Sequence, residues 1–287
     1  MMNWKQLISA KRFGMEEFHE ERQENRSEFQ RDYDRLIFSA PFRRLQNKTQ
    51  VFPLPGSVFV HNRLTHSLEV ASVGRSLGDD VAKALLERHP ELQDSFLPEI
   101  GSIVSAACLA HDLGNPPFGH SGEKAISTFF SEGKGVRLKE KQPNGEQLSP
   151  MEWEDLTHFE GNANAFRILT HQFEGRRKGG FVLTYTTLAS IVKYPFSSSL
   201  ARTKSKFGFF VSEEESFQKI ATELGLTLLN EHPLKYARHP LVYLVEAADD
   251  ICYQMMDIED AHKLKILTTQ ETKELLLSYF SKERQAH

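Results

Sequence analysis

The stretch SAACLAHDLGNPPFGHSGEKAI, residues 105–126, predicts an all-α protein with a functional site at the end of a helix. Residues from about Pro98 to Leu113 are apolar on nearly every side, which is typical of a central helix that its neighbours bury. The Gly-Asn-Pro-Pro sequence that follows is a strong signal for the end of a helix. We therefore expect His111 and Asp112 to lie together where a buried helix ends.

These two neighbours are candidate metal ligands. A charged Asp in a buried helix is costly unless it is paired or binds a cation. Adjacent residues on an α-helix point about 100° apart, so His111 and Asp112 can share one ion only near the helix end. A His-Asp dipeptide alone is weak evidence, because a core histidine beside an Asp that caps another helix gives the same pattern.

Two other stretches add side chains of the same kind. A long helix expected after Asn62 carries His66 among leucines that face the core. The apolar stretch VYLVEAADDICYQMMDIED, residues 242–260, contains the acids Glu246, Asp249, Asp250 and Asp257. Acids in an apolar helix need a cation or several hydrogen-bond donors. A mixed nitrogen and oxygen ligand set with open positions favours a catalytic metal over a structural one.

The ligand types suggest which metal ions could bind, and a nearby His–Glu pair suggests a group that transfers a proton. We expect one divalent ion per site, with Mg²⁺ or Mn²⁺ favoured and Fe, Ni, Co or Zn left open. His120 and Glu123 are three residues apart just after the turn, so their side chains can meet across one turn of the next helix. A histidine that a carboxylate orients is suited to transfer a proton.

The rest of the chain predicts helices and almost no strand. A long helix is capped by Asn62 or Thr65 and ends at Pro90, and others are expected over 162–172, 187–192, 214–229 and 241–256. The polar residues 131–157 are interpreted as a long surface loop, and 206–214 as one short strand or hairpin edge. We divide the chain into a charged N-terminal arm or solvated helix (1–35), a main helical domain (36–265) and the start of a C-terminal helical part (266–287).

Composition narrows the class of protein. The chain has 287 residues, 39% of them hydrophobic, and a formal net charge of −4, which excludes whole-chain disorder and a dedicated basic coat. Cys108 and Cys252 lie in apolar runs without a CxxC pair, so we expect buried thiols in a reducing compartment. No signal sequence or membrane span is expected, and we interpret the protein as soluble and cytoplasmic.

At this point the chain resembles the HD superfamily of metal phosphohydrolases and, within it, the deoxyguanosine-triphosphate triphosphohydrolase family. The H…HD…D order alone would be a weak match. The resemblance covers most of residues 25–260 and rests on an ordered set of motifs, which is very specific. The motifs, in chain order, are RDYDR, FSAPFRRLQNKTQVF, HNRLTHSLEVA, AHDLGNPPFGHSGEKA, HFEGNANAFRIL, VKYP and EAADDICY.

The resemblance implies a role for particular residues. The implied metal ligands are His66, His111, Asp112 and Asp249. Asp249 is preferred to Asp250 because Tyr253 and Asp257 then fall where the family contacts the sugar. His120 would be the catalytic histidine near the α-phosphate, and Glu123 would orient it. The implied substrate contacts are Gln50, Val51, Arg63, His158, Asn162, Lys193, Tyr194, Tyr253 and Asp257.

The resemblance also implies a reaction and partners. Family members hydrolyse a deoxynucleoside triphosphate (dNTP) to deoxynucleoside and inorganic triphosphate, and we favour dGTP as the substrate here. Many form homo-oligomers, as dimers or hexamers, and some are activated by a dNTP effector or bind single-stranded DNA. Their chains are usually much longer, with a helical C-terminal part that contributes to base recognition.

The charge of the expected substrate predicts a set of basic side chains in the site. The triphosphate carries about four negative charges and needs cations, for which Arg63, Lys193 and the basic residues of 202–206 are candidates, although 202–206 could equally be a solvated loop.

Two alternative functions remain open for this chain. One is an HD nucleotidase or phosphodiesterase acting on other nucleotides, and the other is a non-catalytic module that senses dNTP or binds single-stranded DNA.

Overall fold

The computed structural model describes residues 2–17, 26–50, 61–140, 145–175, 178–201 and 206–285. These residues are mainly helical, as expected, and their one sheet is a short antiparallel pair, β1 (Leu228–Asn230) with β2 (Lys235–Tyr236). No helix in these ranges has both the length and the apolar composition that crossing a membrane requires.

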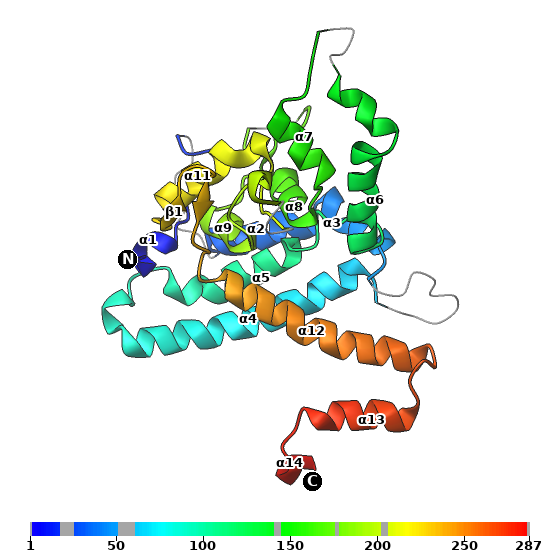
Figure 1. The fold of residues 1–287 in the computed structure, drawn as a ribbon. Helices are drawn as coiled ribbons and strands as arrows, with labels where there is room; N and C mark the ends of the chain where they lie inside the picture. The colour runs from blue at the N-terminus through cyan, green and yellow to red at the C-terminus, as the bar shows by residue number, and fades with distance from the viewer. Residues whose placement is uncertain are drawn as a thin grey trace.

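Three helices form the centre of the molecule: α4 (Arg63–Arg88), α5 (Ile100–Ala110) and α12 (Val242–Lys263) (Figure 1). Asn62 caps α4 through a capping box with Thr65, as the sequence predicts. Nearly every residue of α5 is buried, which confirms the expected central helix. The backbones of α4 and α5 touch, because a Cβ on Gly78 would lie 2.7 Å from the Gly101 Cα atom.

The turn after α5 has its own packing partner. The helix ends at Ala110, three residues before the predicted Leu113, and His111 and Asp112 begin the turn. Gly114 is needed there, since a Cβ would lie 2.0 Å from the Gly161 carbonyl oxygen at the start of α8 (Gly161–Thr170). The turn leads into α6 (Gly119–Ser131).

Three expectations for the outer elements were wrong in part. The predicted loop 131–157 contains η4 (Lys134–Lys139) and α7 (Pro150–Thr157), whose capping box begins at Ser149. The predicted strand 206–214 contains η6 (Val211–Glu213) and only an isolated bridge between Ser197 and Phe209. The helix predicted over 214–229 is shorter, α11 (Glu214–Glu223), because the chain leaves it at Gly225 with φ +65° and then forms β1.

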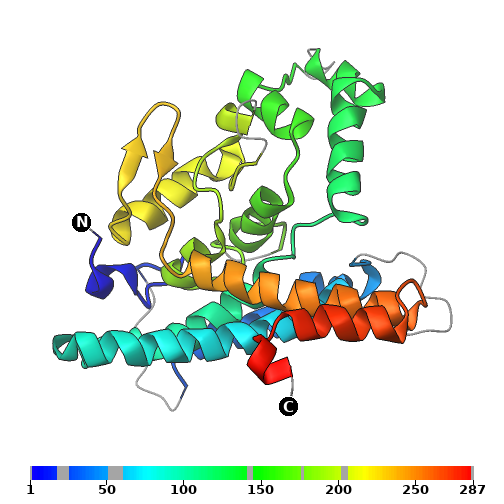
Figure 2. The same cartoon turned by 60° about the horizontal axis from the view of Figure 1, so that its bottom comes forward.

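Most of the remaining elements lie above α4 and α12 in Figure 2, and α13 follows from the far end of α12. α9 (Tyr185–Ile191) is buried along its whole length and leads to the segment that holds Lys193 and Tyr194. The other helices are α1 (Trp4–Leu7), α2 (Glu28–Ile37), α3 (Ala40–Arg44), α13 (Thr269–Ser278) and α14 (Lys282–Gln285), and the short 3₁₀ turns are η1 (Leu45–Asn47), η2 (Pro90–Leu92), η3 (Leu97–Glu99) and η5 (Ser198–Leu200).

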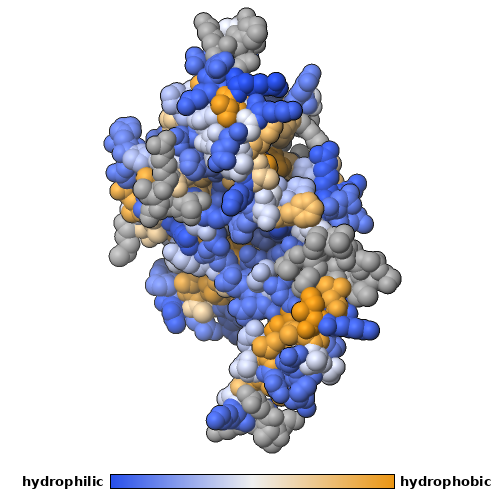
Figure 3. Space-filling view, turned by 45° about the vertical axis from the view of Figure 1, so that its right-hand side comes forward, coloured by the Kyte–Doolittle hydropathy of each residue, from blue (hydrophilic) through white to orange (hydrophobic). Residues whose placement is uncertain are grey.

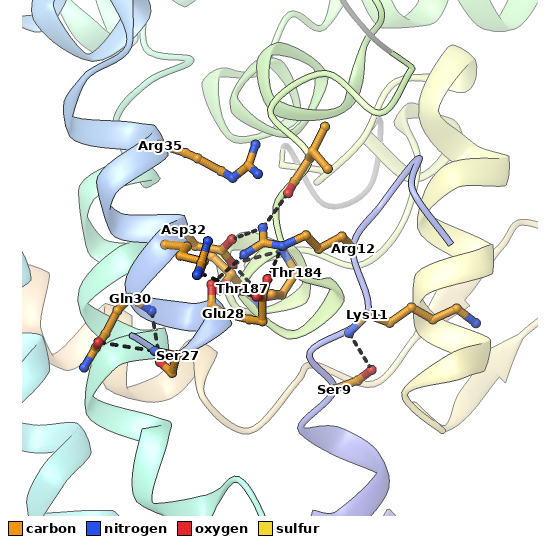
Figure 4. Close-up of polar contacts among 12 residues, drawn as sticks. Ser9, Lys11, Arg12, Ser27, Glu28, Gln30, Asp32, Arg35, Thr184 and Thr187 are labelled. Carbon is orange, nitrogen blue, oxygen red and sulfur yellow. Dashed lines mark hydrogen bonds and ion pairs between the residues drawn. The ribbon is translucent and has the colours of Figure 1, made fainter. Parts of the chain in front are cut away.

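The described part of residues 1–35 is not a solvated arm. Arg12 is only 1% exposed, and its guanidinium donates to Glu28 and, at 2.7 Å each, to the Asp32 Oδ1 atom and the Val182 carbonyl oxygen (Figure 4). Asp32 also accepts hydrogen bonds from the backbone and side chain of Thr184, the N-cap of α9. The sequence interpretation was wrong here because three of these charged side chains, Arg12, Glu28 and Asp32, pair with one another inside the fold.

The C-terminal elements are packed least. α13 has no buried residue. Exposed apolar side chains follow α12 and α13, and Figure 3 shows hydrophobic surface gathered in the lower half of the molecule. The exposed residues of this part are Tyr243, Ile251, Tyr253, Met255, Ile266, Leu275, Tyr279 and Phe280.

Candidate functional site

A cavity of about 540 Å³ opens where α4, the turn after α5, α6 and α12 meet. The end of α9 and the start of α8 complete its wall. The structure brings most of the predicted site residues to this one cavity. Those on its wall are Gln50, Arg63, His66, His111, Asp112, His120, Glu123, Asn162, Lys193, Tyr194, Asp249 and Tyr253.

The four predicted metal ligands converge. His66, His111 and Asp112 each offer one ligand atom, and these atoms lie within 4.8 Å of one another. The Asp249 Oδ1 atom lies 2.9 Å from His66 Nε2 and 3.5 Å from His111 Nε2. Because His66 comes from α4 and Asp249 from α12, the cluster joins all three central helices.

The donor set fits a cation. His111 Nδ1 donates to the Cys108 carbonyl oxygen at 2.6 Å, so the neutral ring has an unprotonated Nε2 atom. This Nε2 atom is buried without a hydrogen-bond partner, 3.6 Å from Asp112 Oδ1 and 3.5 Å from Asp249 Oδ1. A lone pair that faces two carboxylates in a buried place is unfavourable unless positive charge lies between them.

The pKa values show the same demand for positive charge. Burial alone would lower the pKa of His111, but the carboxylates of Asp112 and Asp249 raise it to about 9. Burial alone would raise the pKa of Asp249, but His111 and His66 hold it well below its usual value. A proton on His111 and a divalent cation in the cluster are two ways to supply the charge that these acids require.

Other side chains fix Asp112. Its Oδ2 atom accepts a hydrogen bond from Arg63 Nη1 at 2.6 Å, and Asn115 donates to its Oδ1 atom. Lys48 Nζ donates to the carbonyl oxygens of Leu113 and Asn115, at 3.3 and 2.6 Å, and so holds the turn from outside the cavity. Sequence reasoning missed Lys48 and Asn115, since only the fold brings them to the turn.

His120 and Glu123 form the predicted pair. His120 Nδ1 lies 2.9 Å from Glu123 Oε2, and the other carboxylate oxygen accepts a hydrogen bond from the Gly161 backbone at 2.8 Å. The His120 side chain is 87% exposed, whereas that of Glu123 is 10% exposed. Burial would raise the pKa of Glu123, but the hydrogen bonds from His120 and Gly161 lower it, so a fixed carboxylate presents the imidazole to the cavity.

The described cations on the wall are already paired with acids. Arg63 binds Asp112, Lys193 Nζ lies 3.0 Å from Glu246, and Lys206 Nζ lies 3.0 Å from Glu160 and 3.4 Å from Glu123. The other two basic candidates of 202–206, Arg202 and Lys204, lie outside the described residues, as does Val51. A highly charged anion would therefore have to share these cations with carboxylates.

Two predicted contacts are not on the wall of this cavity. His158 lines a second cavity of about 940 Å³ between α6, η4 and α7, where its Nδ1 atom lies 3.3 Å from Glu154 Oε2. Asp257 lies one turn beyond Tyr253 on α12, and its charge raises the pKa of that tyrosine. Conversely, Phe118, Ser190 and Glu246 are on the wall although the sequence analysis proposed no contact for them.

Comparison with known proteins gives one family model and several curated relatives. The model described as HD domain matches residues 63–178. A deoxyguanosinetriphosphate triphosphohydrolase-like protein of Pseudomonas aeruginosa strain LESB58 is 46% identical over 284 residues, covering 96% of this chain and 61% of that protein. A protein of the same description from Synechocystis is 46% identical over 275 residues, covering 93% of this chain and 61% of that protein.

A third relative is named without the qualifier. The deoxyguanosinetriphosphate triphosphohydrolase of Yersinia enterocolitica is 36% identical over 304 residues, covering 94% of this chain and 57% of that protein. The chain thus spans about three fifths of the length of the curated relatives it matches.

Proposed function

The chain belongs to the HD superfamily and, within it, to the deoxyguanosinetriphosphate triphosphohydrolase family, and on that premise we propose that it hydrolyses dNTPs, dGTP in preference, to deoxynucleoside and inorganic triphosphate. The observation that carries this proposal is the buried His111 Nε2 atom, which has no hydrogen-bond partner and lies between Asp112 and Asp249 in the cavity that also contains the His120–Glu123 pair.

The reaction would use one divalent metal ion, for which Mg²⁺ and Mn²⁺ are our first choices, with Fe, Ni, Co and Zn next. His66, His111, Asp112 and Asp249 would hold it. An ion of this kind supplies Lewis acidity, which neutralises charge on a phosphoryl group and lowers the pKa of water. Arg63 and Asn115 support the site by holding Asp112 in one orientation.

His120 would donate the proton to the leaving group. The 5′-oxygen of the sugar leaves as a poor alkoxide, so a positioned general acid is worth about 10²–10⁴ in rate. Glu123 accepts the hydrogen bond from His120 Nδ1, which leaves the Nε2 atom of the exposed ring to carry the proton that is transferred. The Gly161 backbone in turn prevents Glu123 from rotating.

The cavity wall supplies contacts for the rest of the substrate. We assign the triphosphate to Arg63, Lys193 and Lys206, whose present carboxylate partners would be exchanged in part for phosphate oxygens. We assign the sugar to Gln50, Asn162, Tyr194 and Tyr253 on the wall, and to Asp257, which lies one turn beyond Tyr253 on α12. The buried Oε1 atom of Gln50 has no hydrogen-bond partner among the described residues, so it is available for a sugar hydroxyl.

Properties of the whole protein extend this proposal. A dNTP effector, single-stranded DNA and a second copy of the chain, in a dimer or a hexamer, are the partners that we expect from the family.

Product analysis tests the reaction. The protein is incubated with each dNTP and each divalent metal, and the products are separated by ion-exchange chromatography. We expect tripolyphosphate and deoxynucleoside from dGTP, and none from an Asp112→Ala control. Orthophosphate or pyrophosphate as the product would favour another HD phosphohydrolase, and tight dNTP binding without turnover would favour a sensor.

A further inference from the structure

Phe118 combines two unfavourable features at the wall of the cavity. Its backbone is left-handed, with φ 66° and ψ 20°, a conformation that bulky L-residues rarely adopt. Its side chain is 63% exposed, although it is one of the largest apolar side chains. A residue that is unfavourable both in its backbone and in its exposure suggests a use outside the fold itself.

The two other described non-glycine residues with positive φ, Val182 and Lys265, do not combine that backbone with an exposed large apolar side chain, because Val182 is 6% exposed and Lys265 is charged. The carbonyl group of Val182 accepts a hydrogen bond from the buried Arg12 at 2.7 Å. Lys265 follows the end of α12, and its N–H group donates to the His262 carbonyl oxygen. By contrast, Phe118 is 63% exposed and lies on the wall of the cavity that holds the candidate metal ligands.

The turn holds Phe118 in this position through its backbone. Gly119 donates to the Pro116 carbonyl oxygen at 3.1 Å, and Ser121 donates to the Phe118 carbonyl oxygen at 3.2 Å. Gly119 also has positive φ, and a Cβ there would lie 2.9 Å from the Arg63 guanidinium. The turn that carries His120 therefore also places Phe118 on the wall of the same cavity.

The chemistry of the ring selects the part of a ligand that it can contact. Its neighbours on the wall include the charged groups of Arg63 and Glu123, which suit phosphate and water. The face of an aromatic ring carries negative potential and disfavours phosphate oxygens, but it packs well on the apolar face of a sugar or a nucleobase. We propose that Phe118 is a substrate-binding residue whose ring packs on the nucleoside half of the substrate; this rests on the proposed function.

Phe118→Asn separates this role from a structural one. Asn tolerates the left-handed backbone conformation. If Phe118 serves only ligand binding, the Phe118→Asn variant should therefore keep the melting temperature of the wild type. If Phe118 stabilises the fold, the variant should melt several degrees lower. Deoxyguanosine and inorganic tripolyphosphate are titrated separately into the Mn²⁺-loaded protein in a calorimeter. We expect Phe118→Asn to weaken deoxyguanosine binding by roughly tenfold and tripolyphosphate binding by less than about twofold.

Two further variants complete the test. Phe118→Tyr keeps the ring and should bind both probes as the wild type does. Phe38→Asn removes another exposed phenylalanine, 72% exposed and not on the cavity wall, and should also leave both affinities unchanged. The proposal is overturned if Phe118→Asn binds deoxyguanosine normally, if both affinities fall together with the melting temperature, or if the wild type binds no deoxyguanosine. Absence of tripolyphosphate release from every dNTP by the wild type would instead overturn the proposed function.

Discussion

The two histidines nearest the turn differ in what holds their Nδ1 atoms. His111 donates to a backbone carbonyl, that of Cys108, so its Nε2 atom is available as a ligand for a cation. His120 is held by the carboxylate of Glu123, so its exposed ring is suited to carry a proton. The same residue type thus serves two purposes within ten residues of sequence, because each ring has a different hydrogen-bond partner.

Replacement of His120 should separate these two purposes. We expect His120→Ala to lower kcat by about 10²–10⁴ while the protein still binds metal, because a general acid is lost and no ligand is changed. Asp112→Ala should lose both activity and metal. Steady-state kinetics and metal content by mass spectrometry measure the two effects. His158→Ala is the matched control, since His158 also pairs with a glutamate but lines the second cavity; full activity of His120→Ala would exclude the proton-donor role.

Asp155 predicts a pH dependence of stability. Burial raises its pKa to about 6, although its Oδ2 atom accepts a hydrogen bond from the Val211 backbone at 2.8 Å. The folded state thus keeps a proton that the unfolded state releases near pH 4. This carboxyl therefore favours folding at low pH, and that contribution is lost as the pH rises from about 4 to 6.

Replacement of Asp155 by Asn should prevent this loss of stability at higher pH. We expect Asp155→Asn to raise the free energy of unfolding by about 1–2 kcal/mol at pH 7.5, and by about half as much at pH 5, because the amide is neutral and keeps the acceptor for Val211. Urea unfolding at the two pH values measures this. Asp155→Ala, which lacks the acceptor, should be less stable at both; a destabilised Asp155→Asn protein at pH 7.5 would contradict the assignment.

At the scale of elements, the spacing of apolar residues predicted the central helices but not the outer elements α7, β1 and β2. Apolar spacing and the Asn62 cap were enough for α4, and the apolar run was enough for α5, because both signals are local. The segment 131–157 is polar, so its composition hid α7, although Ser149 and Glu152 form a capping box that could have been found. The strand pair β1–β2 depends on a turn at Gly225, whose positive φ the sequence alone does not require.

The candidate site was predictable to the extent that its residues had chemical signals. The ligand types and the three-residue spacing of His120 and Glu123 were visible in the sequence. The contacts of Lys48 and of the Gly161 backbone were not, because each joins a group near the turn to a distant element through main-chain atoms. A contact made through main-chain atoms does not require a particular residue type, so a single sequence does not reveal it.

Gly161 links the two halves of the site, and its replacement should disturb both. A Cβ on Gly161 would lie 2.2 Å from the Asn115 Oδ1 atom and 2.9 Å from Glu123 Oε1. Asn115 supports Asp112, and Glu123 holds His120. We expect Gly161→Ala to lower kcat by about tenfold to a hundredfold, since small displacements of catalytic groups have effects of that size.

A glycine elsewhere provides the control for this prediction. Gly175→Ala introduces the same methyl group at a position with φ +73° and no atom within 4 Å, so it tests for a general loss of stability. Steady-state kinetics and thermal unfolding are measured for both variants. Equal kcat values for Gly161→Ala and Gly175→Ala would show that the close approach at Gly161 does not position the catalytic groups.

At the scale of the whole molecule, the candidate metal ligands connect parts of the chain that are far apart. His66 and Asp249 are 183 residues apart in the sequence, yet their side chains lie 2.9 Å from each other. Arg12 makes a second such connection, because it joins the N-terminal segment to α2 and to Val182, two residues before the N-cap of α9 (Figure 4). The C-terminal α13 lacks comparable contacts, since none of its residues is buried.

A metal held across α4, α5 and α12 should stabilise the entire fold. An ion that binds the folded state alone adds about 2.7 kcal/mol at a concentration of 100 times its Kd, which corresponds to a rise of roughly 5–10 °C in melting temperature. We expect Mn²⁺ to produce such a rise at pH 7.5, and a chelator to reverse it. Differential scanning fluorimetry measures the shift.

Two neighbouring aspartates on α12 provide a variant and a matched control for this prediction. Asp249 lies 2.9 Å from His66 and 3.5 Å from His111, whereas Asp250 is exposed. Asp249→Asn should therefore abolish the thermal shift, and Asp250→Asn, the same chemical change one residue further on, should retain it. The reverse result would place the fourth ligand at Asp250. An equal shift in both variants would mean that Mn²⁺ stabilises the protein without a ligand from this part of α12, which contradicts a site shared by the three helices.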